Sequence, residues 1–442
     1  MEVSKELLVM QNFWWSGRSL KFDPVLRIYQ QSPLRFRNKE LNNLVFKKDL
    51  IYLFEGGRAI GKTTFSKLLI RHLIDREGVV PKNILYYSCN NILTFEQLNE
   101  VIKLFLQTDE KKRLYLIIDE ISLVRGWDFG IKSLQRAGKL KNVTLFLFNA
   151  VQDKNLKINL VKKEFRPLNF LEFVNLFNPG LVEKITKENF KELGYKLDYY
   201  LDIYFLTGGY LNNINSFKKK TVVDQAAYDN FLAFTNLDIA RQGRDINLAR
   251  QILEEIVAHT GEPIGYKTIA KNTKAKTHIT IVEYLELFEK IFLTSTLFQE
   301  KAGKDISRRA KKVFFADPFI FWAIYGYIRG ATDSWRLATE HLHSKKVFCA
   351  LVKTIIFAFL IKKGSKVFYF RDNTRNVEID FLVKKDRGVQ PILVRYNREV
   401  SEADYNIFKR AKFKNGIIIT NNQLDLKGDI KLIPLTYFLI FE

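Results

Sequence analysis

The sequence predicts an α/β protein whose first domain is a parallel sheet with helices on both faces. Three observations predict it: a glycine-rich loop between an apolar strand and a helix, a second apolar strand that ends in two acidic residues, and further strands that alternate with helical segments. Strands in such an alternation pair in parallel, because each helix returns the chain to the same edge of the sheet. Ligands of these sheets bind at the carboxyl ends of the strands.

The glycine-rich loop, residues 56–65, reads GGRAIGKTTF and fits the pattern G-x-x-x-x-G-K-[ST]. An apolar run precedes it and apolar residues follow it at helical spacing, so the loop joins a strand to a helix. The backbone N–H groups of such a loop and the helix N-terminus attract phosphate. An ordinary glycine-rich turn is the alternative, which this context disfavours. The residues predicted to bind the phosphates of ATP are Gly56, Gly57, Arg58, Ala59, Ile60, Gly61, Lys62, Thr63 and Thr64.

A second apolar strand, within residues 113–123, ends in Asp119 and Glu120. We expect Lys62 to reach the β- and γ-phosphates, and Thr63 and Asp119 to hold Mg²⁺, Asp119 through water. Glu120 is placed to take a proton from the water that attacks the γ-phosphate, which makes it the predicted catalytic base. The alternative is a strand end that is acidic only because it is exposed to solvent.

A third apolar strand, residues 142–150, ends in Asn149, and residues 83–90 predict a further strand of the same sheet. Asn149 is the second predicted catalytic residue, because a polar side chain at this place can orient the attacking water against the γ-phosphate. A plain turn-forming asparagine is the alternative interpretation of the same residue.

The composition is that of a globular protein of several domains: 442 residues, of which 47% are hydrophobic and 27% are charged. No apolar run reaches membrane-spanning length, and the N-terminus lacks the basic region of a signal peptide. Cys89 and Cys349 lie far apart and indicate neither a zinc site nor a disulfide framework. We therefore expect a cytoplasmic protein without a membrane partner.

The formal net charge is +23, which favours a polyanionic partner; a solvated basic face without a specific partner is the alternative. From residue 246 the pattern predicts three helices and a hairpin, the order of a winged helix-turn-helix. The hairpin carries Lys301, Lys304, Arg308, Arg309, Lys311 and Lys312. The residues predicted to contact nucleic acid are Lys276, Lys304, Arg308 and Arg309. The alternative is an intramolecular packing module, whose hairpin charges pair with acids such as Glu283 or Glu286.

The remaining segments complete the predicted domain order. Residues 333–442 read as a helix, three strands, a helix and a strand, which predicts a small second α/β domain. We expect an N-terminal helical and aromatic segment, the α/β core, a helical lid, the winged helix-turn-helix and the C-terminal domain at residues 1–45, 46–180, 181–245, 246–316 and 317–442.

The chain as a whole resembles the AAA-type P-loop ATPases of archaea and bacteria that carry a C-terminal domain of unknown function with a restriction-endonuclease-like fold. The resemblance is carried by NFWW, GGRAIGKTT, VVPKNILYYSCN, LIIDEISLVRGW, RPLNFLEF, LTGGYLNNI, KVFFADPFI and EIDFLV. It implies ATP and Mg²⁺ as cofactors, held by Gly56, Gly61, Lys62, Thr63, Asp119 and Glu120.

Three departures from the family's pattern limit what the resemblance implies. The third strand ends in FNA instead of a small residue, Gly and Ser, which leaves Asn149 as the substitute sensor. No Gly-Arg pair precedes the Pro-Leu segment, so no arginine finger is predicted there. A nuclease of this fold needs Asp and then Glu-x-Lys, but Asp380 is followed by Leu393 and Arg395 at the last two places. We therefore expect a binding or structural relic of a nuclease.

The predicted function is a Mg²⁺-dependent ATPase that couples its nucleotide state to domains that bind nucleic acid, with DNA favoured. The alternative is a nucleotide-switched regulator or scaffold that acts on a protein partner with little hydrolysis. A homo-oligomer is compatible with either function.

Overall fold

The structure is a computed structural model that describes residues 5–106, 113–153, 156–300, 310–386 and 388–442. The chain divides into two compact units, Met1–Arg166 and Pro167–Glu442. This boundary falls ahead of residue 180, the predicted end of the first α/β domain. Within the described ranges, every helix is too short or too polar to cross a lipid bilayer.

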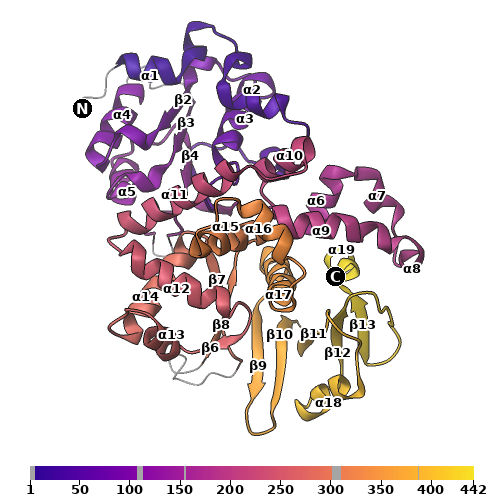
Figure 1. Cartoon of the computed structure of the whole chain (residues 1–442). Helices are drawn as coiled ribbons and strands as arrows, with labels where there is room; N and C mark the ends of the chain where they lie inside the picture. Colours follow the sequence, from indigo (N-terminus) through magenta and orange to yellow (C-terminus); the bar gives the residue numbers. More distant parts are fainter. Residues whose placement is uncertain (1–4, 107–112, 154–155, 301–309, 387) are drawn as a thin grey trace. The chain divides into compact units, whose positions relative to one another are not determined.

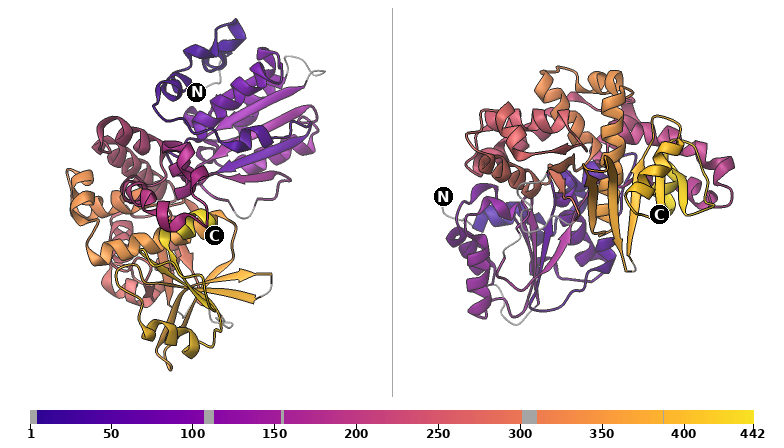
Figure 2. Two further views of the ribbon diagram at one scale, coloured as in Figure 1. Left: turned by 90° about the vertical axis from the view of Figure 1, so that its right-hand side faces the viewer. Right: turned by 90° about the horizontal axis from the view of Figure 1, so that it is seen from below.

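The first unit is built on a five-stranded parallel sheet with the strand order β2-β3-β4-β1-β5 (Figure 1). The left-hand view of Figure 2 shows these strands lying side by side. The predicted parallel sheet is therefore confirmed. The central strands are buried along nearly their whole length, which explains why their sequences are continuously apolar. The strands are β1 Leu50–Glu55, β2 Ile84–Ser88, β3 Leu114–Asp119, β4 Val143–Asn149 and β5 Val161–Glu164.

Helices cover both faces of this sheet. One core joins α1, α4 and α5 to strand residues such as Leu116, and the other joins α2 and α3 to residues such as Phe146. The helices are α1 Lys5–Gln11, α2 Pro24–Gln31, α3 Lys62–Asp75, α4 Phe95–Leu106 and α5 Trp127–Arg136. Short 3₁₀ helices connect them: η1 Phe13–Ser16, η2 Leu20–Phe22, η3 Lys39–Asn43, η4 Pro81–Asn83, η5 Cys89–Asn91 and η6 Ile121–Leu123.

The N-terminal segment is anchored on the edge strand β2. The Asn12 side chain donates to the Tyr86 carbonyl at 2.9 Å and accepts from the Tyr86 N–H at 2.6 Å. The indole N–H groups of Trp14 and Trp15 both donate to the Ile84 carbonyl, at 3.3 Å and 2.8 Å. The segment thus covers an edge that would otherwise present unpaired backbone groups.

The second unit begins with a helical region. These helices are α6 Phe170–Phe177, α7 Pro179–Lys184, α8 Phe190–Leu193, η7 Gly194–Leu197, α9 Asp198–Thr207, α10 Leu211–Lys220 and α11 Gln225–Arg241. The turn after α9 requires two glycines. Gly208 has a φ of +60°, and a Cβ added there would lie 1.8 Å from the Asp317 Oδ1 atom. The Gly209 N–H donates to Asp317 Oδ2 at 2.9 Å, so the turn is held tightly against the start of α15.

Residues 246–315 form three helices and a small antiparallel sheet with the order β6-β8-β7. The elements are α12 Ile246–Ala258, β6 Pro263–Ile264, α13 Tyr266–Asn272, α14 His278–Lys290, β7 Thr294–Leu297 and β8 Lys311–Phe315. The loop that joins β7 to β8, with Lys301, Lys304, Arg308 and Arg309, lies outside the described residues.

Two cations that the sequence assigned to an exposed wing are buried on β8 instead. Lys311 is 2% exposed, with its ammonium 3.7 Å from the centre of the Tyr266 ring. Burial lowers the pKa of Lys311 to about 8. Lys312 is fully buried and forms ion pairs with Glu378 and Asp380. Successive side chains of a strand point to opposite faces of the sheet, but neither face of β8 is exposed to solvent. The strand is the central one of its sheet, and all five of its residues are buried.

The C-terminal part follows as three helices and a mixed five-stranded sheet with the order β13-β12-β11-β10-β9. Residues beyond β7 continue toward this sheet: the Tyr369 N–H donates to the Phe298 carbonyl at 3.0 Å, and the Glu300 N–H donates to the Tyr369 carbonyl at 2.8 Å. The elements are α15 Pro318–Arg329, α16 Ser334–His341, α17 Lys345–Lys362, β9 Val367–Asp372, β10 Val377–Lys385, β11 Gly388–Val394, α18 Glu402–Arg410, β12 Gly416–Thr420, β13 Ile430–Pro434 and α19 Leu435–Phe441.

Candidate nucleotide-binding site

The glycine-rich loop lies between the carboxyl end of β1 and the start of α3, as the sequence predicts. Gly61, the residue before α3, has a φ of +94°, which a residue with a side chain adopts only at a cost. A Cβ added to Gly56 would lie 2.5 Å from the Phe165 carbonyl oxygen. Both glycines are thus required by the path of the backbone in this loop.

Lys62 folds its side chain back across this loop. Its ammonium donates to the Gly56 carbonyl at 2.8 Å and to the Gly57 carbonyl at 2.7 Å, and the residue is only 5% exposed. The cation is therefore held inside the loop, where the oxygens of a bound phosphate chain would meet it.

The predicted magnesium ligands lie together. The Thr63 hydroxyl donates to Asp119 Oδ2 at 2.8 Å, and the Glu120 N–H donates to Asp119 Oδ1 at 3.0 Å. Asp119 is 1% exposed, at the carboxyl end of β3. A hydroxyl and a carboxylate at this separation form the oxygen donor set that Mg²⁺ prefers.

Tyr86 completes the surroundings of Asp119 and was not predicted as a site residue. Its hydroxyl donates to Asp119 Oδ2 at 3.2 Å from the neighbouring strand β2. Burial, followed by the charge of Asp119, raises the pKa of Tyr86 well above its usual value, so the hydroxyl remains a donor. The sequence shows only that β2 is apolar. It does not reveal that the Tyr86 hydroxyl contacts Asp119, the last residue of β3.

A buried lysine lies behind Tyr86. The Lys67 ammonium is 3.3 Å from the centre of the Tyr86 ring and 3.5 Å from Asp23 Oδ2. Burial lowers the pKa of Lys67, and the Asp23 carboxylate opposes that shift. Lys67 lies one helical turn after Thr63 on α3, so this charged group supports the phosphate loop's helix from its buried side.

Glu120 does not point freely into the site. Its backbone is in the left-handed region with a φ of +56°, and its carboxylate pairs with the Arg58 guanidinium at 2.6 Å. The two side chains are 19% and 12% exposed. Arg58, predicted as a phosphate contact, therefore holds the predicted catalytic base against the phosphate loop.

Asn149 is 2% exposed and uses its side-chain oxygen in its own turn, where it accepts from the Val151 N–H at 3.1 Å. Its backbone carbonyl accepts from the Gly56 N–H at 3.1 Å, so the residue does adjoin the phosphate loop. The turn that the sequence allowed as an alternative is present, and the water-orienting role stays a prediction.

Glu55, the last residue of β1, is a buried acid that the sequence analysis missed. It is 4% exposed, it pairs in register with Asn149, and it accepts from the Asp153 N–H at 2.8 Å. Burial raises its pKa, partly offset by the Asp153 N–H and by Lys162. An acid that follows five apolar residues and directly precedes the glycine loop was the signal that could have identified it.

The C-terminal sheet holds Asp380 in a cluster of cations. Its carboxylate lies 3.0 Å from Lys353, 3.3 Å from Lys312 and 3.9 Å from Arg395, and it accepts from the Val394 N–H at 2.9 Å. Burial alone would raise the pKa of Asp380, but the three cations hold it well below its usual range. Leu393, the residue at the expected second ligand position, is buried and apolar. Both carboxylate oxygens thus already have partners, which suits a structural ion pair better than a metal ligand.

The predicted nucleic-acid residues are described only in part. Lys276 is exposed and directly precedes Thr277, the N-cap residue of α14. Lys304, Arg308 and Arg309 lie outside the described residues. Further exposed lysines, which the sequence analysis did not assign, lie on α13 and in the segment before α14: Lys267, Lys271 and Lys274.

Comparison with known families identifies the first α/β domain. Residues 48–174 match the model of an AAA domain, so this part of the chain is an AAA-type P-loop domain. Residues 199–329 and 348–438 match two domains of unknown function, DUF8612 and DUF4143. The resemblance noted from the motifs is therefore confirmed for the ATPase family, and the C-terminal match assigns no activity.

The curated relatives span nearly the whole chain. An uncharacterized protein of Methanocaldococcus jannaschii, MJ1637, is 22% identical over 98% of this chain and 95% of its own length. An uncharacterized protein of Haemophilus influenzae is 21% identical over 90% of this chain and 92% of its own length.

Solved structures show a loose likeness. The Orc1 protein of Aeropyrum pernix in complex with DNA is 12% identical, with a TM-score of 0.32 over 72% of this chain and 94% of its own. A signal-transduction ATPase with numerous domains from Pyrococcus horikoshii, PH0952, is 14% identical, with a TM-score of 0.28 over 75% of this chain and 49% of its own. Scores this low say little, so the fold assignment rests on the strand order and the matched AAA domain.

Proposed function

We propose that this AAA-type chain binds ATP with Mg²⁺, hydrolyses it, and couples the nucleotide state to nucleic-acid binding by residues 246–315. The observation that carries the nucleotide part is the 2.8 Å contact between the Thr63 hydroxyl and the Asp119 carboxylate at the head of the phosphate loop. These two residues come from α3 and β3, and a hydroxyl and a carboxylate brought together beside a phosphate loop suit a Mg²⁺-nucleotide site.

The residues present fit ATP and Mg²⁺. Lys62 exchanges its two carbonyl partners for phosphate oxygens, and the loop N–H groups receive the phosphate chain. Thr63 and Asp119 hold the metal, which when bound neutralises charge on the β- and γ-phosphates. Tyr86 fixes the orientation of Asp119. Glu120 would accept the proton of the attacking water, which requires its carboxylate to be released from Arg58.

Two substitutions test the nucleotide part. Lys62→Ala should abolish detectable ATP binding, because the phosphates lose their main cation. Glu120→Gln should preserve ATP binding and reduce turnover by about 10²-fold or more, because only the base is lost. Both are measured by nucleotide titration and by phosphate release, with the exposed Lys82→Ala as the matched control. ATP turnover in Glu120→Gln at the wild-type rate would show that the base is assigned wrongly.

The nucleic-acid part is supported by an exposed basic surface around the start of α14. Among the residues that the structure describes, its four lysines make no ion pair; they are Lys267, Lys271, Lys274 and Lys276. Two of the three acids of α14 are engaged elsewhere: Glu283 pairs with Arg244 at 2.9 Å, and Glu289 accepts from the Thr296 N–H at 2.8 Å. The third, Glu286, is exposed and is outnumbered by the four lysines. The surface thus keeps its positive charge for phosphates.

The salt dependence of binding tests this surface. Each phosphate contact contributes a slope of about −0.9 to the plot of log K against log salt for duplex DNA. The double substitution Lys274→Ala and Lys276→Ala should flatten that slope by about 2, similarly for every sequence. Fluorescence anisotropy over a salt series measures it, with Lys139→Ala and Lys141→Ala on the first unit as the control. An unchanged slope in the α14 variant would remove this surface as a contact.

A second candidate function is a nucleotide-switched regulator that acts on a protein partner with little hydrolysis. The Arg58–Glu120 ion pair favours this candidate, because the Arg58 guanidinium of the phosphate loop already neutralises the charge of the predicted base. ATP turnover measured with and without single- and double-stranded DNA and RNA separates the two candidates. A regulator binds ATP without turnover in all of these conditions, whereas the proposed ATPase turns it over and responds to a nucleic acid.

A further inference from the structure

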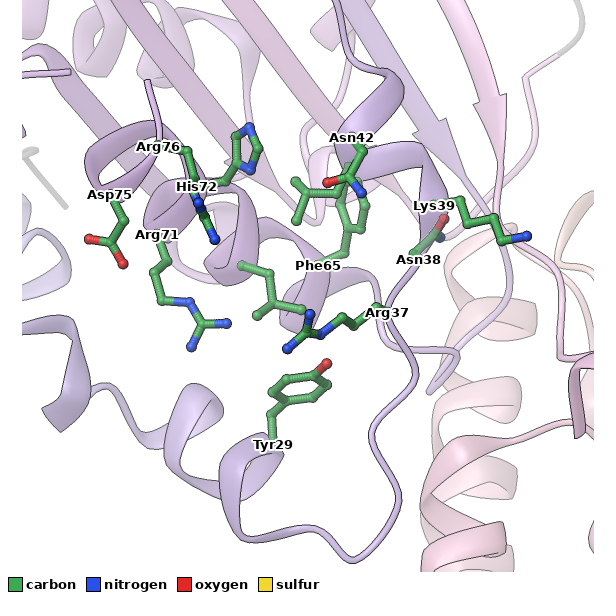
Figure 3. A pocket seen from close by; sticks show the side chains of 12 residues that line it. Tyr29, Arg37, Asn38, Lys39, Asn42, Phe65, Arg71, His72, Asp75 and Arg76 are labelled. Carbon is green, nitrogen blue, oxygen red and sulfur yellow. The ribbon is translucent and has the colours of Figure 1, made fainter. Parts of the chain in front are cut away.

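A cavity of about 580 Å³ lies on the outer side of α3, away from the phosphate loop. Its walls come from α3 between Phe65 and Arg76 and from the segment between Tyr29 and Asn42 that precedes β1 (Figure 3). No residue between Gly56 and Thr64 lines it. We call this cavity the α3 pocket. Its volume is within the range of roughly 300–1,000 Å³ that small-molecule sites occupy.

The α3 pocket is lined by unpaired cations from two separate segments. Arg37 and Lys39 come from the segment before β1, and Arg71 and Arg76 come from α3. In the described part of the chain, none of these four side chains makes an ion pair or a hydrogen bond. Figure 3 shows the Arg37 guanidinium above the Tyr29 ring and the Arg71 guanidinium to its left.

The acid among the lining residues does not neutralise this charge. Asp75 lies at the far side of the pocket in Figure 3, beyond Arg71, and forms no ion pair within the described ranges. Cations near the C-terminal end of a helix stabilise its dipole, and this gives a structural reason for the presence of Arg71 and Arg76. It does not account for Arg37, which approaches the same space from another segment.

The floor of the pocket is apolar and aromatic. Tyr29 and Phe65 are 8% and 3% exposed, and Leu41 and Leu68 lie beside them. The Tyr29 hydroxyl donates to the Phe36 carbonyl at 3.2 Å, so the ring is fixed with one face toward the pocket. A flat organic group fits this floor, while the guanidinium groups above it suit an anion.

We propose that the α3 pocket binds a dianionic terminal phosphate attached to a flat organic body, as in a mononucleotide or at the 5′-phosphorylated end of a nucleic-acid strand. Three guanidinium groups offer more donors than the two free oxygens of a phosphodiester can accept, whereas a terminal phosphate presents three oxygens and two charges. This site is separate from the proposed ATP site and does not depend on it.

The test uses the full chain with Lys62→Ala, so that the phosphate loop does not compete for the ligand. AMP is titrated into this protein by calorimetry, and adenosine serves as the ligand without phosphate. AMP should bind saturably and adenosine should not. The further double substitution Arg37→Gln and Arg71→Gln should weaken AMP binding at least tenfold, since two charge-assisted hydrogen bonds to the phosphate are lost.

The matched control is Arg136→Gln, an exposed arginine at the end of α5 that makes no ion pair in the described part of the chain. It should change AMP binding less than twofold. Equal AMP affinity in the pocket variant, or no saturable binding of any phosphorylated probe, overturns the proposal. A protein that keeps Lys62 and carries only the two pocket substitutions should bind ATP as the wild type does. A loss of ATP binding in this variant would make the pocket a part of the ATP site and would also overturn the proposal.

Short oligonucleotides with a 5′-phosphate and with a 5′-hydroxyl distinguish the two sources of the ligand. Tighter binding of the phosphorylated strand than of AMP identifies a strand end, and the reverse identifies a free mononucleotide. Equal binding of the two strands, together with no binding of AMP, would contradict the terminal phosphate.

Discussion

At the residue scale, the nucleotide site is held together by contacts between the phosphate loop and the end of β3: the Thr63 hydroxyl donates to Asp119, and Arg58 pairs with Glu120. The pattern around Gly56 and Lys62 is local, and the acids at the end of β3 follow from one apolar run, so a single sequence reveals both. The pairing of Arg58 with Glu120 joins two segments far apart in the chain, and it depends on the left-handed backbone of Glu120. No propensity rule predicts that conformation for a glutamate.

Tyr86 and Tyr87 allow a test of the support given to Asp119. They are neighbours on β2, but only the Tyr86 hydroxyl donates to Asp119; among the residues that the structure describes, the buried Tyr87 hydroxyl has no hydrogen-bond partner. Tyr86→Phe should raise the Mg²⁺ concentration for half-maximal ATP turnover by roughly three- to tenfold, since a hydrogen bond to a charged group is lost. Tyr87→Phe should leave it unchanged. ATP binding without Mg²⁺ should be unaltered in both variants, and equal Mg²⁺ dependence in the two would contradict the role of Tyr86.

At the scale of elements, periodicity was sufficient for the first sheet and insufficient for the small sheet of residues 246–315. Strands β1, β3 and β4 are buried on both faces and are therefore continuously apolar. The strand β8 is equally buried, yet it begins with two lysines, which a sequence argument assigns to solvent. The side chains are accommodated by the Tyr266 ring and by two acids of β10, and neither partner is near β8 in the sequence.

Asp317 links two elements and predicts a pH dependence. It caps α15 by accepting from the Phe319 N–H, and it accepts from Gly209 in the turn after α9. Burial raises its pKa to about 7, although both N–H groups oppose this shift. The folded state thus holds a proton that the unfolded state releases at lower pH. The stability that this proton contributes is lost as pH rises through about 7, with a slope of at most about 1.4 kcal/mol per pH unit.

Asp317→Asn tests this dependence. Asparagine keeps the N-cap and cannot ionise. The melting temperature of the wild type relative to that of Asp317→Asn should fall between pH 5 and pH 7.5 and then level off. Asp333→Asn, which changes the exposed N-cap residue of α16, should follow the wild type throughout. Parallel curves for the wild type and Asp317→Asn would mean that Asp317 does not titrate in this range.

At the scale of the whole molecule, the sequence predicted two α/β regions but not the ion pairs that connect the elements of the second unit. Motifs and hydrophobic patterns predicted the α/β core and a small C-terminal α/β domain. The cluster around Asp380 collects Lys312 of β8, Lys353 of α17 and Arg395 after β11, and Lys353 also pairs with Glu262 at 2.7 Å. Ion pairs over such separations are invisible in a single sequence.

Removing Asp380 should destabilise the second unit. Asp380→Ala leaves buried cations with fewer counter-charges, which costs about 3–5 kcal/mol. The free energy of unfolding in urea measures it, and Asp386→Ala, an exposed acid at the end of β10, is the control. The same cluster predicts no cleavage of linear, circular or branched DNA with Mg²⁺ or Mn²⁺. Cleavage by the wild type that disappears in a folded Asp380 variant would restore the nuclease assignment.

The burial of Lys312 has a mechanical consequence. Any bend between the small sheet and the C-terminal sheet would pull this ammonium from Glu378 and Asp380 and leave a charge in an apolar interior. The backbone bonds between residues 298–300 and Tyr369 resist the same bend. We therefore expect the small sheet and the C-terminal sheet to move together as one rigid body.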